Sequence, residues 1–487
     1  MARASLNRTS SGFKALGQAS ERGKTVNDTI PVMTPSTRTT PFLIYLVYIV
    51  TLGPLQFGFH LGELNAPETV ITCKVDRLPT YSILGLPPMY TDESGGPIAT
   101  KSGRLFALKW LVVFLAMGPI TEALAHRIWI LALGRAISGL GAGAAAVVCP
   151  IYVSEIAPPD KRGLFGAFTQ VQINSGILFA QVLGYFLSKN TKWRWILATA
   201  GFIAAVTFIG LMFAPETPKW LAANNRPRMA RTTLQRIRGK NVEIREEMEQ
   251  WEITEGEGEE QSLLSALQDP PSRKKTSKSI FEVVRLAEYR RAVLAVVGNM
   301  MAQQLCGINA VVMYSVEILG QVMPTRAALI TVIVSAINVL VGLLSSPLPD
   351  KIGRKACLLL SISGMGSASV MLAIGLEKDL RYLTIAGIGI FVCSFGVGLG
   401  PVPFLLPSEL VGPEAVGAVS SWALTGSWLS TFFVAQLFPM LNAALPHGHV
   451  WWVFVATAGV FGLFVAIFVP GSKGKANPDE VWGRSSS

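Results

Sequence analysis

A short polar stretch inside an apolar segment carries the groups best suited to binding a small molecule. Residues 303 to 309 read Gln-Gln-Leu-Cys-Gly-Ile-Asn, and a tyrosine follows at position 314, in a segment that begins near Arg291. A polar side chain without a partner is costly in hydrocarbon, so such groups usually pair across helices or face a watery cavity. Neutral donors and acceptors suit a hydroxyl-rich neutral ligand better than an ion. Simple pairing between helices is the alternative interpretation.

The amides of this stretch do not share one narrow stripe of a continuous helix. At about 100° per residue, Gln303 and Asn309 lie about 600° apart, and Gln304 and Asn309 about 500° apart. Gly307 permits a break, and a broken helix lining a cavity would bring all three amides to it. The stretch therefore predicts a kinked or interrupted helix.

Composition identifies the elements that must position these amides as membrane spans. Half of the 487 residues are hydrophobic, only 15% are charged, and the mean hydropathy is +0.44. These values exclude an ordinary soluble domain. Apolar segments of roughly twenty residues predict eleven spans, near residues 41 to 61, 105 to 125, 128 to 152, 164 to 188, 193 to 214, 291 to 315, 327 to 349, 356 to 376, 383 to 407, 417 to 444 and 448 to 470.

Charge between the spans predicts the organisation of the chain. The net charge of +11 comes from basic residues that cluster between spans, where an orienting role accounts for them better than nucleic-acid binding does. A charged insert separates two bundles, and its periodic stretches at 229 to 251 and 262 to 268 predict surface helices. The expected parts are a disordered cytosolic tail (1 to 40), an N-terminal bundle (41 to 215), a cytosolic insert (216 to 290), a C-terminal bundle (291 to 470) and a cytosolic tail (471 to 487).

An internal repeat relates the two bundles. The Lys-x-Gly-Arg motif at 101 to 104 recurs at 351 to 354, and the Ser-Glu pair at 154 and 155 recurs at 408 and 409. Two full spans precede the second Lys-x-Gly-Arg motif, but only one precedes the first. The simplest interpretation is that most of the second span, near residues 85 to 97, has been lost. The loss is either an error in the predicted gene structure or a real feature of the protein.

The two repeats resemble the major facilitator superfamily, and the finer motifs resemble its sugar porter family along residues 41 to 475. The resemblance implies an all-α polytopic membrane protein of two pseudo-symmetric six-helix bundles, here with the second transmembrane helix missing and about eleven spans. Glycines and prolines at 398 to 403 predict a second interrupted helix. The motifs that carry the resemblance are Gly134-Arg135, the run 150 to 158 with Arg162-Gly163, the run 215 to 221, the stretch 303 to 309, and the run 398 to 404 with Glu409.

The resemblance also implies a sugar site and a substrate. Phe404 stands where the family usually has a tryptophan, and an aromatic face suits the apolar side of a pyranose. The implied substrate is a hexose, with glucose the first candidate, whereas the residues alone indicate only a neutral polyol. The residues that the resemblance places at the sugar are Gln170, Gln303, Gln304, Asn309, Asn338 and Phe404.

Charged residues of the motifs are expected where spans meet the cytosol. Opposite charges from the two halves could pair there, holding an inner gate shut while the site faces outward. Charges that only set topology or snorkel to the interface are the alternative. The residues expected to form this gate are Arg104, Arg135, Glu155, Arg162, Arg354 and Glu409.

The first span bears on energy coupling. It reads Gln-Phe-Gly-Phe-His at 56 to 60, where proton-driven sugar porters carry an acid, and so looks more like the glucose facilitators. No Asp or Glu is expected in the middle of a span, which leaves His60 as the candidate proton-linked group, or as a packing residue. The sequence therefore predicts facilitated diffusion by alternating access. A proton symporter using His60 and a transport-dead sugar sensor or trafficking factor are the alternatives.

Several other classes of function lack support in the sequence. No nucleophile with a base, nucleotide-binding loop or metal-ligand spacing is evident, so we predict no enzyme, no catalytic residue, no cofactor and no metal site. The expected partners are a small sugar and the lipid bilayer, without nucleic acid, and the protein is expected to be a monomer. The expected location is the plasma membrane, with an internal vacuolar or endosomal membrane as the alternative.

Overall fold

The computed structural model describes most of the chain from Thr39 onward, which forms one compact unit. The predicted N-terminal tail, the surface helix predicted at 262 to 268 and the span predicted to be lost near 85 to 97 lie outside the described residues. The described residues are 39–67, 103–158, 161–188, 191–224, 226–239, 242, 244, 247–248, 279–323, 326–412, 415–445, 447–471 and 478–483.

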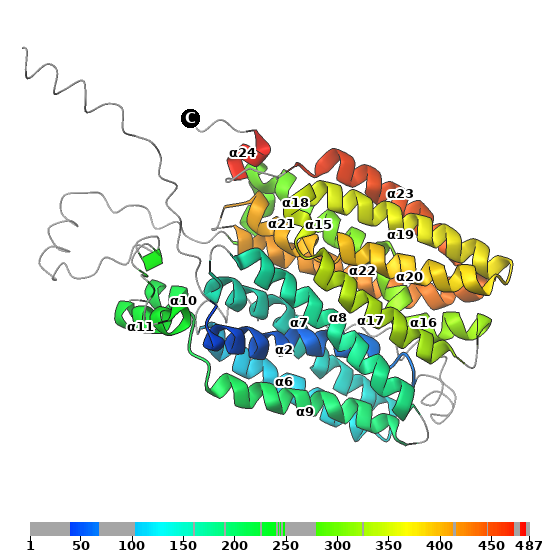
Figure 1. Ribbon diagram of the computed structural model, residues 1–487, viewed down its shortest axis with the longest axis horizontal. Coiled ribbons are helices and arrows are strands. Elements are labelled where there is room, and N and C mark those ends of the chain that lie inside the picture. Colours follow the sequence, from blue (N-terminus) through cyan, green and yellow to red (C-terminus); the bar gives the residue numbers. More distant parts are fainter. Residues whose placement is uncertain are drawn as a thin grey trace, which may run out of the picture. The chain divides into compact units, whose positions relative to one another are not determined.

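The first half of the described chain is a bundle of long helices (Figure 1). Thr40 begins the bundle by accepting a hydrogen bond from Leu43 N at 3.1 Å, with Pro41 in the first helical position. Two short helices follow the bundle, α10 (Pro218–Ala223) and α11 (Pro227–Arg238). Helix α11 overlaps the start of the surface helix predicted at 229 to 251. The long helices are α2 (Pro41–Gly62), α6 (Arg104–Ala123), α7 (Ile128–Ile156), α8 (Arg162–Leu187) and α9 (Trp193–Met212).

The second half repeats this arrangement with two of its helices broken. Its long elements are α15 (Ala287–Leu305) with α16 (Ile308–Val322), α17 (Ala327–Ser345), α19 (Arg354–Glu377), α20 (Arg381–Val397) with α21 (Val402–Leu410), α22 (Val416–Ala444) and α23 (Val450–Phe468). Short helices α14 (Ile280–Arg285), α18 (Leu348–Ile352) and α24 (Pro478–Trp482) accompany them.

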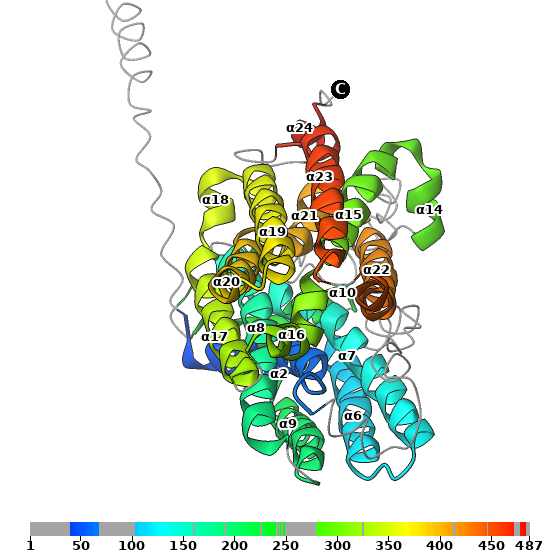
Figure 2. The ribbon, with the colours of Figure 1, turned by 90° about the vertical axis from the view of Figure 1, so that its right-hand side faces the viewer.

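Packing within the halves follows a pseudo-two-fold relation. Figure 2 shows α19, α20 and α23 of the second half above α2, α6 and α9 of the first. Helix α2 packs against α8 and α9 as α15 packs against α22 and α23, and α6 packs against α7 and α9 as α19 packs against α20 and α23. Across the halves, α8 lies against α17. Among the described residues, no helix between α2 and α6 is the counterpart of α17.

Ten helices of the described residues are long and apolar enough to cross a membrane. Helix α8 is absent from that set although its 26 residues span about 39 Å, more than the hydrocarbon thickness. Its amides explain the difference, because Gln170, Gln172, Asn174 and Gln181 lower the hydropathy of the helix and are all buried within the protein. With α8 the described chain has the eleven predicted spans.

Glycines allow α2 and α8 to touch along their backbones. A Cβ on Gly58 would lie 1.9 Å from Ile173 O, and a Cβ on Gly176 would lie 1.9 Å from Leu55 O. Each glycine thus faces a carbonyl of the other helix, which is the close approach that small residues permit in membrane bundles. The contact holds α8 at the centre of the molecule, between α2 and α17.

We predict that Gly176→Leu destabilises the protein by about 3 kcal/mol, because the added side chain must push α2 away from α8. The measurement is the midpoint of thermal unfolding of the detergent-purified protein. Gly459→Leu on α23 is the matched control, since no described atom lies within 4 Å of a Cβ added there. Equal midpoints for the two variants would contradict this role of the glycine.

Candidate functional site

The predicted break in the amide-bearing helix is confirmed. Helix α15 ends at Leu305, Gly307 has a φ of +100°, and α16 begins at Ile308. A Cβ on Gly307 would lie 2.7 Å from the Phe454 ring, so space as well as backbone conformation favours glycine. The break turns the chain between Gln304 and Asn309 and lets Asn309 Nδ2 donate to Gln304 Oε1 at 2.7 Å.

A second break, between α20 and α21, is also confirmed and connects to the first. Helix α20 ends at Val397 and α21 begins at Val402, which leaves carbonyl groups without helical partners. Gln303 Nε2 donates to Leu399 O at 2.7 Å and to Gly400 O at 3.2 Å. Gln303 therefore stabilises the second break with its amide nitrogen.

The remaining amides form a chain that crosses to α22. Gln304 Nε2 donates to Gln303 Oε1 and to Ser427 Oγ, both at 3.0 Å. Asn309 Nδ2 also donates to Thr431 Oγ1 at 3.1 Å. We call the side chains of these five residues the α15–α22 polar group. Each amide has a partner, and the group presents a prearranged set of neutral acceptors and donors.

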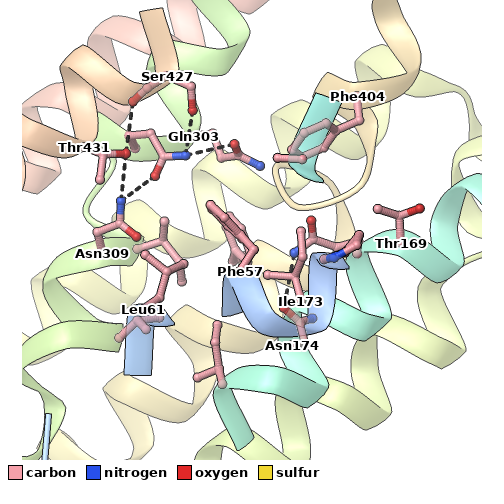
Figure 3. Close-up of a pocket in the computed structure, with 18 of the residues that line it drawn as sticks. Phe57, Leu61, Thr169, Ile173, Asn174, Gln303, Asn309, Phe404, Ser427 and Thr431 are labelled. Carbon is pink, nitrogen blue, oxygen red and sulfur yellow. Dashed lines mark hydrogen bonds between the residues drawn. The ribbon is translucent and has the colours of Figure 1, made fainter. Parts of the chain in front are cut away.

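This polar group borders a cavity between the two halves of about 810 Å³, counted to its open mouth. Figure 3 shows Asn309, Ser427 and Thr431 on one side of Phe57, and Asn174 and Thr169 on the other. Phe57 meets Trp428 edge to face with ring centroids 5.2 Å apart, which joins α2 to α22 at the wall. The mixture of mostly apolar side chains with a few amides is that of a small-molecule site.

All six residues that the sequence placed at the sugar line this one cavity: Gln170, Gln303, Gln304, Asn309, Asn338 and Phe404. Their part in binding stays a prediction. Sequence reasoning missed other polar residues of the wall, although helical spacing could have found two of them. Asn174 follows Gln170 by four residues, and Thr431 follows Ser427 by four, which puts each pair on one helix face.

One asparagine connects the two halves at the end of α2. Asn65 Nδ2 donates to Val312 O at 2.9 Å and to Ser315 Oγ at 2.8 Å, and Asn65 Oδ1 accepts from Val316 N at 3.3 Å. All three partners belong to α16. These bonds hold the halves together beyond the cavity, so they must break if the cavity opens at this end.

A buried cluster of charged groups lies at the same end of the first half and includes His60. His60 Nδ1 lies 2.9 Å from Glu63 Oε1, and Arg135 pairs with Glu63 and, at 3.7 Å, with Glu122. Both glutamates are fully buried, and Ser138 donates to Glu122. The prediction that His60 is proton-linked stays a prediction, but two buried carboxylates at the ends of spans lie beside it, Glu63 just past α2 and Glu122 in the last turn of α6.

The expected position of Arg135 at the cytosolic end is wrong. Arg135 and Glu155 are separated by twenty residues of the same helix, α7, which is about 30 Å and thus the thickness of the hydrocarbon core. Arg104, which meets Glu155 at 2.9 Å, marks the end predicted to face the cytosol. Arg135 instead meets the last turn of α2, at the opposite end.

The other expected gate residues pair within each half. Arg104 bonds Glu155, and Arg354 bonds Glu409 at 2.7 Å, each arginine following a glycine with positive φ that precedes its helix. The repeat brings each of these arginines to the acid of its own bundle, and pairing of charges between the two halves stays a prediction. Arg162 begins α8, but its side chain lies outside the described residues.

Glu216, which lies outside the spans, supports the pair formed by Arg104 and Glu155. Its carboxylate accepts hydrogen bonds from Arg104 N at 3.0 Å and from Leu105 N, which caps the first turn of α6. Thr217 Oγ1 donates to Glu155 at 2.7 Å. Burial raises the pKa of the Glu216 carboxyl above its ordinary value, against the opposing effect of these backbone hydrogen bonds.

Two pseudo-symmetric bundles with a cavity of amide and aromatic groups between them define a multi-pass membrane carrier. The sequence pattern of the family described as "Sugar (and other) transporter" matches residues 46–477, and the chain belongs to that family, whose members are transporters and not enzymes. The fold is that of the major facilitator superfamily. The xylose transporter XylE from E. coli, in a partially occluded inward-open conformation, superimposes with a TM-score of 0.72 at 23% identity. The match covers 90% of this chain and all of that chain.

Similar proteins span almost the same length. A probable metabolite transport protein of Saccharomyces cerevisiae is 29% identical over 475 residues, covering 91% of this chain and 95% of its own. A facilitated trehalose transporter of Bombyx mori is 30% identical over 450 residues, covering 88% and 84%. The protein is therefore an integral multi-pass membrane transporter of the sugar porter class.

We predict that Arg135→Ala destabilises the protein by about 3 to 5 kcal/mol, because two buried carboxylates lose their cation. The midpoint of thermal unfolding of the detergent-purified protein measures the loss. Arg127→Ala, which removes an exposed arginine at the start of the same helix, is the control. Equal losses in Arg135→Ala and Arg127→Ala would contradict the pairing.

Proposed function

We propose that this chain carries a hexose, with glucose as the first candidate, by facilitated diffusion and alternating access. The observation that carries the proposal is the α15–α22 polar group, whose neutral amides and hydroxyls face a cavity that both halves enclose. Such groups recognise hydroxyls without requiring charge on the ligand. The aromatic rings of Phe57, Phe404 and Trp428 in the same wall suit the C–H faces of a pyranose.

Alternating access follows from the two breaks and the contacts between halves. Because the helices are broken beside the cavity, α16 can tilt relative to α15, and α21 can tilt relative to α20. In the present conformation the bonds from Asn65 to α16 close one end. Opening that end breaks these bonds, and the charge pairs of Arg104 and Arg354 keep each half intact during the movement.

We predict that Gln304→Ala raises the KM for glucose roughly tenfold or more, because Ser427 and Asn309 lose their common partner and the sugar loses an amide. The measurement is uptake of labelled glucose by liposomes that hold the purified chain. Asn224→Ala, an exposed amide on the surface beyond α10, is the control. An unchanged KM would contradict the site, and no saturable uptake by folded wild-type protein would favour the alternative of a sugar sensor or trafficking factor.

Proton-coupled symport is the second candidate, and the buried charge cluster favours it. Glu63 and Glu122 flank Arg135, and His60 adds a third titratable group in contact with Glu63. If one of these carboxylates bound a proton, it would lose its pairing with Arg135. Protonation would then change the contacts at the end of α2. None of these four residues lines the cavity, although Leu61 beside His60 does, so a proton would bind next to the sugar and not in contact with it.

An imposed proton gradient separates the two candidates. Under facilitated diffusion, liposomes with an inward proton gradient should fill with glucose only to the outside concentration, because no ion supplies work. Concentrative uptake that disappears in Glu122→Gln would overturn that expectation and establish symport. Counterflow exchange, which needs no gradient, serves as the control that the variant still carries sugar.

The membrane and the oligomeric state belong to the same proposal. We propose the plasma membrane as the location and a monomer as the working form, since the cavity is complete within one chain as far as the structure describes it. Fractionation of a tagged chain would distinguish the plasma membrane from a vacuolar or endosomal one.

A further inference from the structure

A short helix at the edge of the second half presents apolar side chains next to basic ones. Helix α14 joins α15 through one extended residue, Leu286, and we call residues 280 to 291 the α14–α15 elbow. Figure 2 shows α14 beyond α15, at the edge of the second half. Trp422 Nε1 donates to Ile280 O at 2.9 Å, and Val283 is fully buried in the core. These contacts hold α14 against α22.

The elbow lies at the end of the bundle that is predicted to face the cytosol. Trp422 stands close to the start of α22, and α22 follows α21, whose end carries Glu409 paired with Arg354. Helix α15 begins a candidate membrane span directly after Leu286. The elbow is therefore placed where the chain passes from the headgroup region into hydrocarbon.

Three apolar side chains in and beside the elbow stay exposed. Phe281 and Val284 lie three residues apart on one face of α14 and are 62% and 40% exposed, and Leu294 on α15 is 47% exposed. Because lipid tails are as apolar as leucine, Leu294 marks the lipid-facing side of α15. An apolar helix face at this level enters the boundary between headgroups and acyl chains.

Three exposed arginines border this apolar surface. Arg285 ends α14, and Arg290 and Arg291 lie in the first turns of α15, on the face that continues to Leu294. Arg290 Nε donates to Val284 O at 3.2 Å, which holds its guanidinium at the end of α14. Within the part of the chain that the structure describes, none of the three arginines forms an ion pair. Their N–H groups are left to bind a phosphate.

The acids of the elbow do not balance these arginines. Glu282 accepts a hydrogen bond from Ser279 N at 3.3 Å, as part of the capping box at the opposite end of α14. Glu288 is the only other acid of the elbow, and in the sequence residues 273 to 291 hold seven Lys/Arg against these two glutamates. A basic excess beside an exposed apolar face, directly before a membrane span, is typical of a surface that recognises anionic lipid.

We propose that the α14–α15 elbow binds anionic phospholipids of the cytosolic leaflet. Arg285, Arg290 and Arg291 bind the headgroups, and Phe281 and Val284 insert between the acyl chains. Guanidinium groups pair with phosphate oxygens, whereas a zwitterionic headgroup carries its own cation, which competes for the same phosphate. The site lies outside the sugar cavity, so this inference does not depend on which cargo the protein carries.

Binding of a fluorescent phosphatidylserine to the purified full chain in neutral detergent tests the proposal. Unlabelled phosphatidylserine should displace the probe, and phosphatidylcholine should displace it at least about tenfold less well. The triple variant Arg285→Gln/Arg290→Gln/Arg291→Gln should weaken binding of the probe at least about tenfold, because three cations at the headgroup are lost.

The matched control removes exposed basic residues at the opposite end of α19 and α20. There Lys378 and Arg381 lie among two acids, Glu377 and Asp379, and so carry no basic excess. The variant Lys378→Gln/Arg381→Gln should change the affinity for the probe by less than about twofold.

Several outcomes would overturn the lipid site. Equal displacement by phosphatidylserine and phosphatidylcholine would do so, and so would equal weakening in the triple variant and the control. Displacement by inorganic phosphate as effective as that by phosphatidylserine would mean that the elbow binds a free anion and not a lipid. If the triple variant does not fold, Arg291→Gln alone should weaken binding about threefold, and an unchanged affinity would count against the site. Lipid binding without sugar uptake would bear on the proposed function alone.

Discussion

The need to pair every polar group inside an apolar bundle governs this structure more than any other constraint. Hydrocarbon offers no water to carbonyls and amides, so a helix can break within the membrane only where a partner replaces the lost hydrogen bonds. Gln303 is that partner, since its amide holds the free carbonyls of Leu399 and Gly400. One break thus depends on the other, and the cavity forms where the two meet. The polar wall that can bind a ligand is also what allows α15 and α20 to end where they do.

Close packing of backbones places the polar walls opposite each other. Gly58 and Gly176 bring α2 onto α8, and α8 lies against α17 of the other half. Helix α8 therefore sits between the two bundles, which explains why it can carry four buried amides and still lie within a membrane protein. The amides at Gln170 and Asn174 then face the cavity, while Gln172 donates to Thr51 within the first half.

Charged side chains occupy different places in the bundles from uncharged polar side chains. Ion pairs occur at both ends of the bundles, with Arg104 and Arg354 at one end and Arg135 at the other. The cavity wall contains only uncharged side chains. This separation suits a neutral cargo, because a charge beside the sugar would need its own counter-ion in a low-dielectric interior. The cluster at Arg135 instead joins the end of α2 to α6 and α7, and none of its charged groups lines the cavity.

The sequence by itself determined the class of protein, the eleven spans, the two breaks and six residues of the cavity, because hydropathy, glycine position and a long family motif are local properties. Only the tertiary structure decided which groups meet. One partner of Arg135, Glu63, lies 72 residues away in the chain, and no local pattern indicates that a glutamate just past α2 will be fully buried. Asn174 likewise reads as one amide among several on α8, and it becomes part of a site only because α17, from the other half, packs against that face. Contacts between distant segments depend on how whole helices pack, which single-residue patterns do not encode.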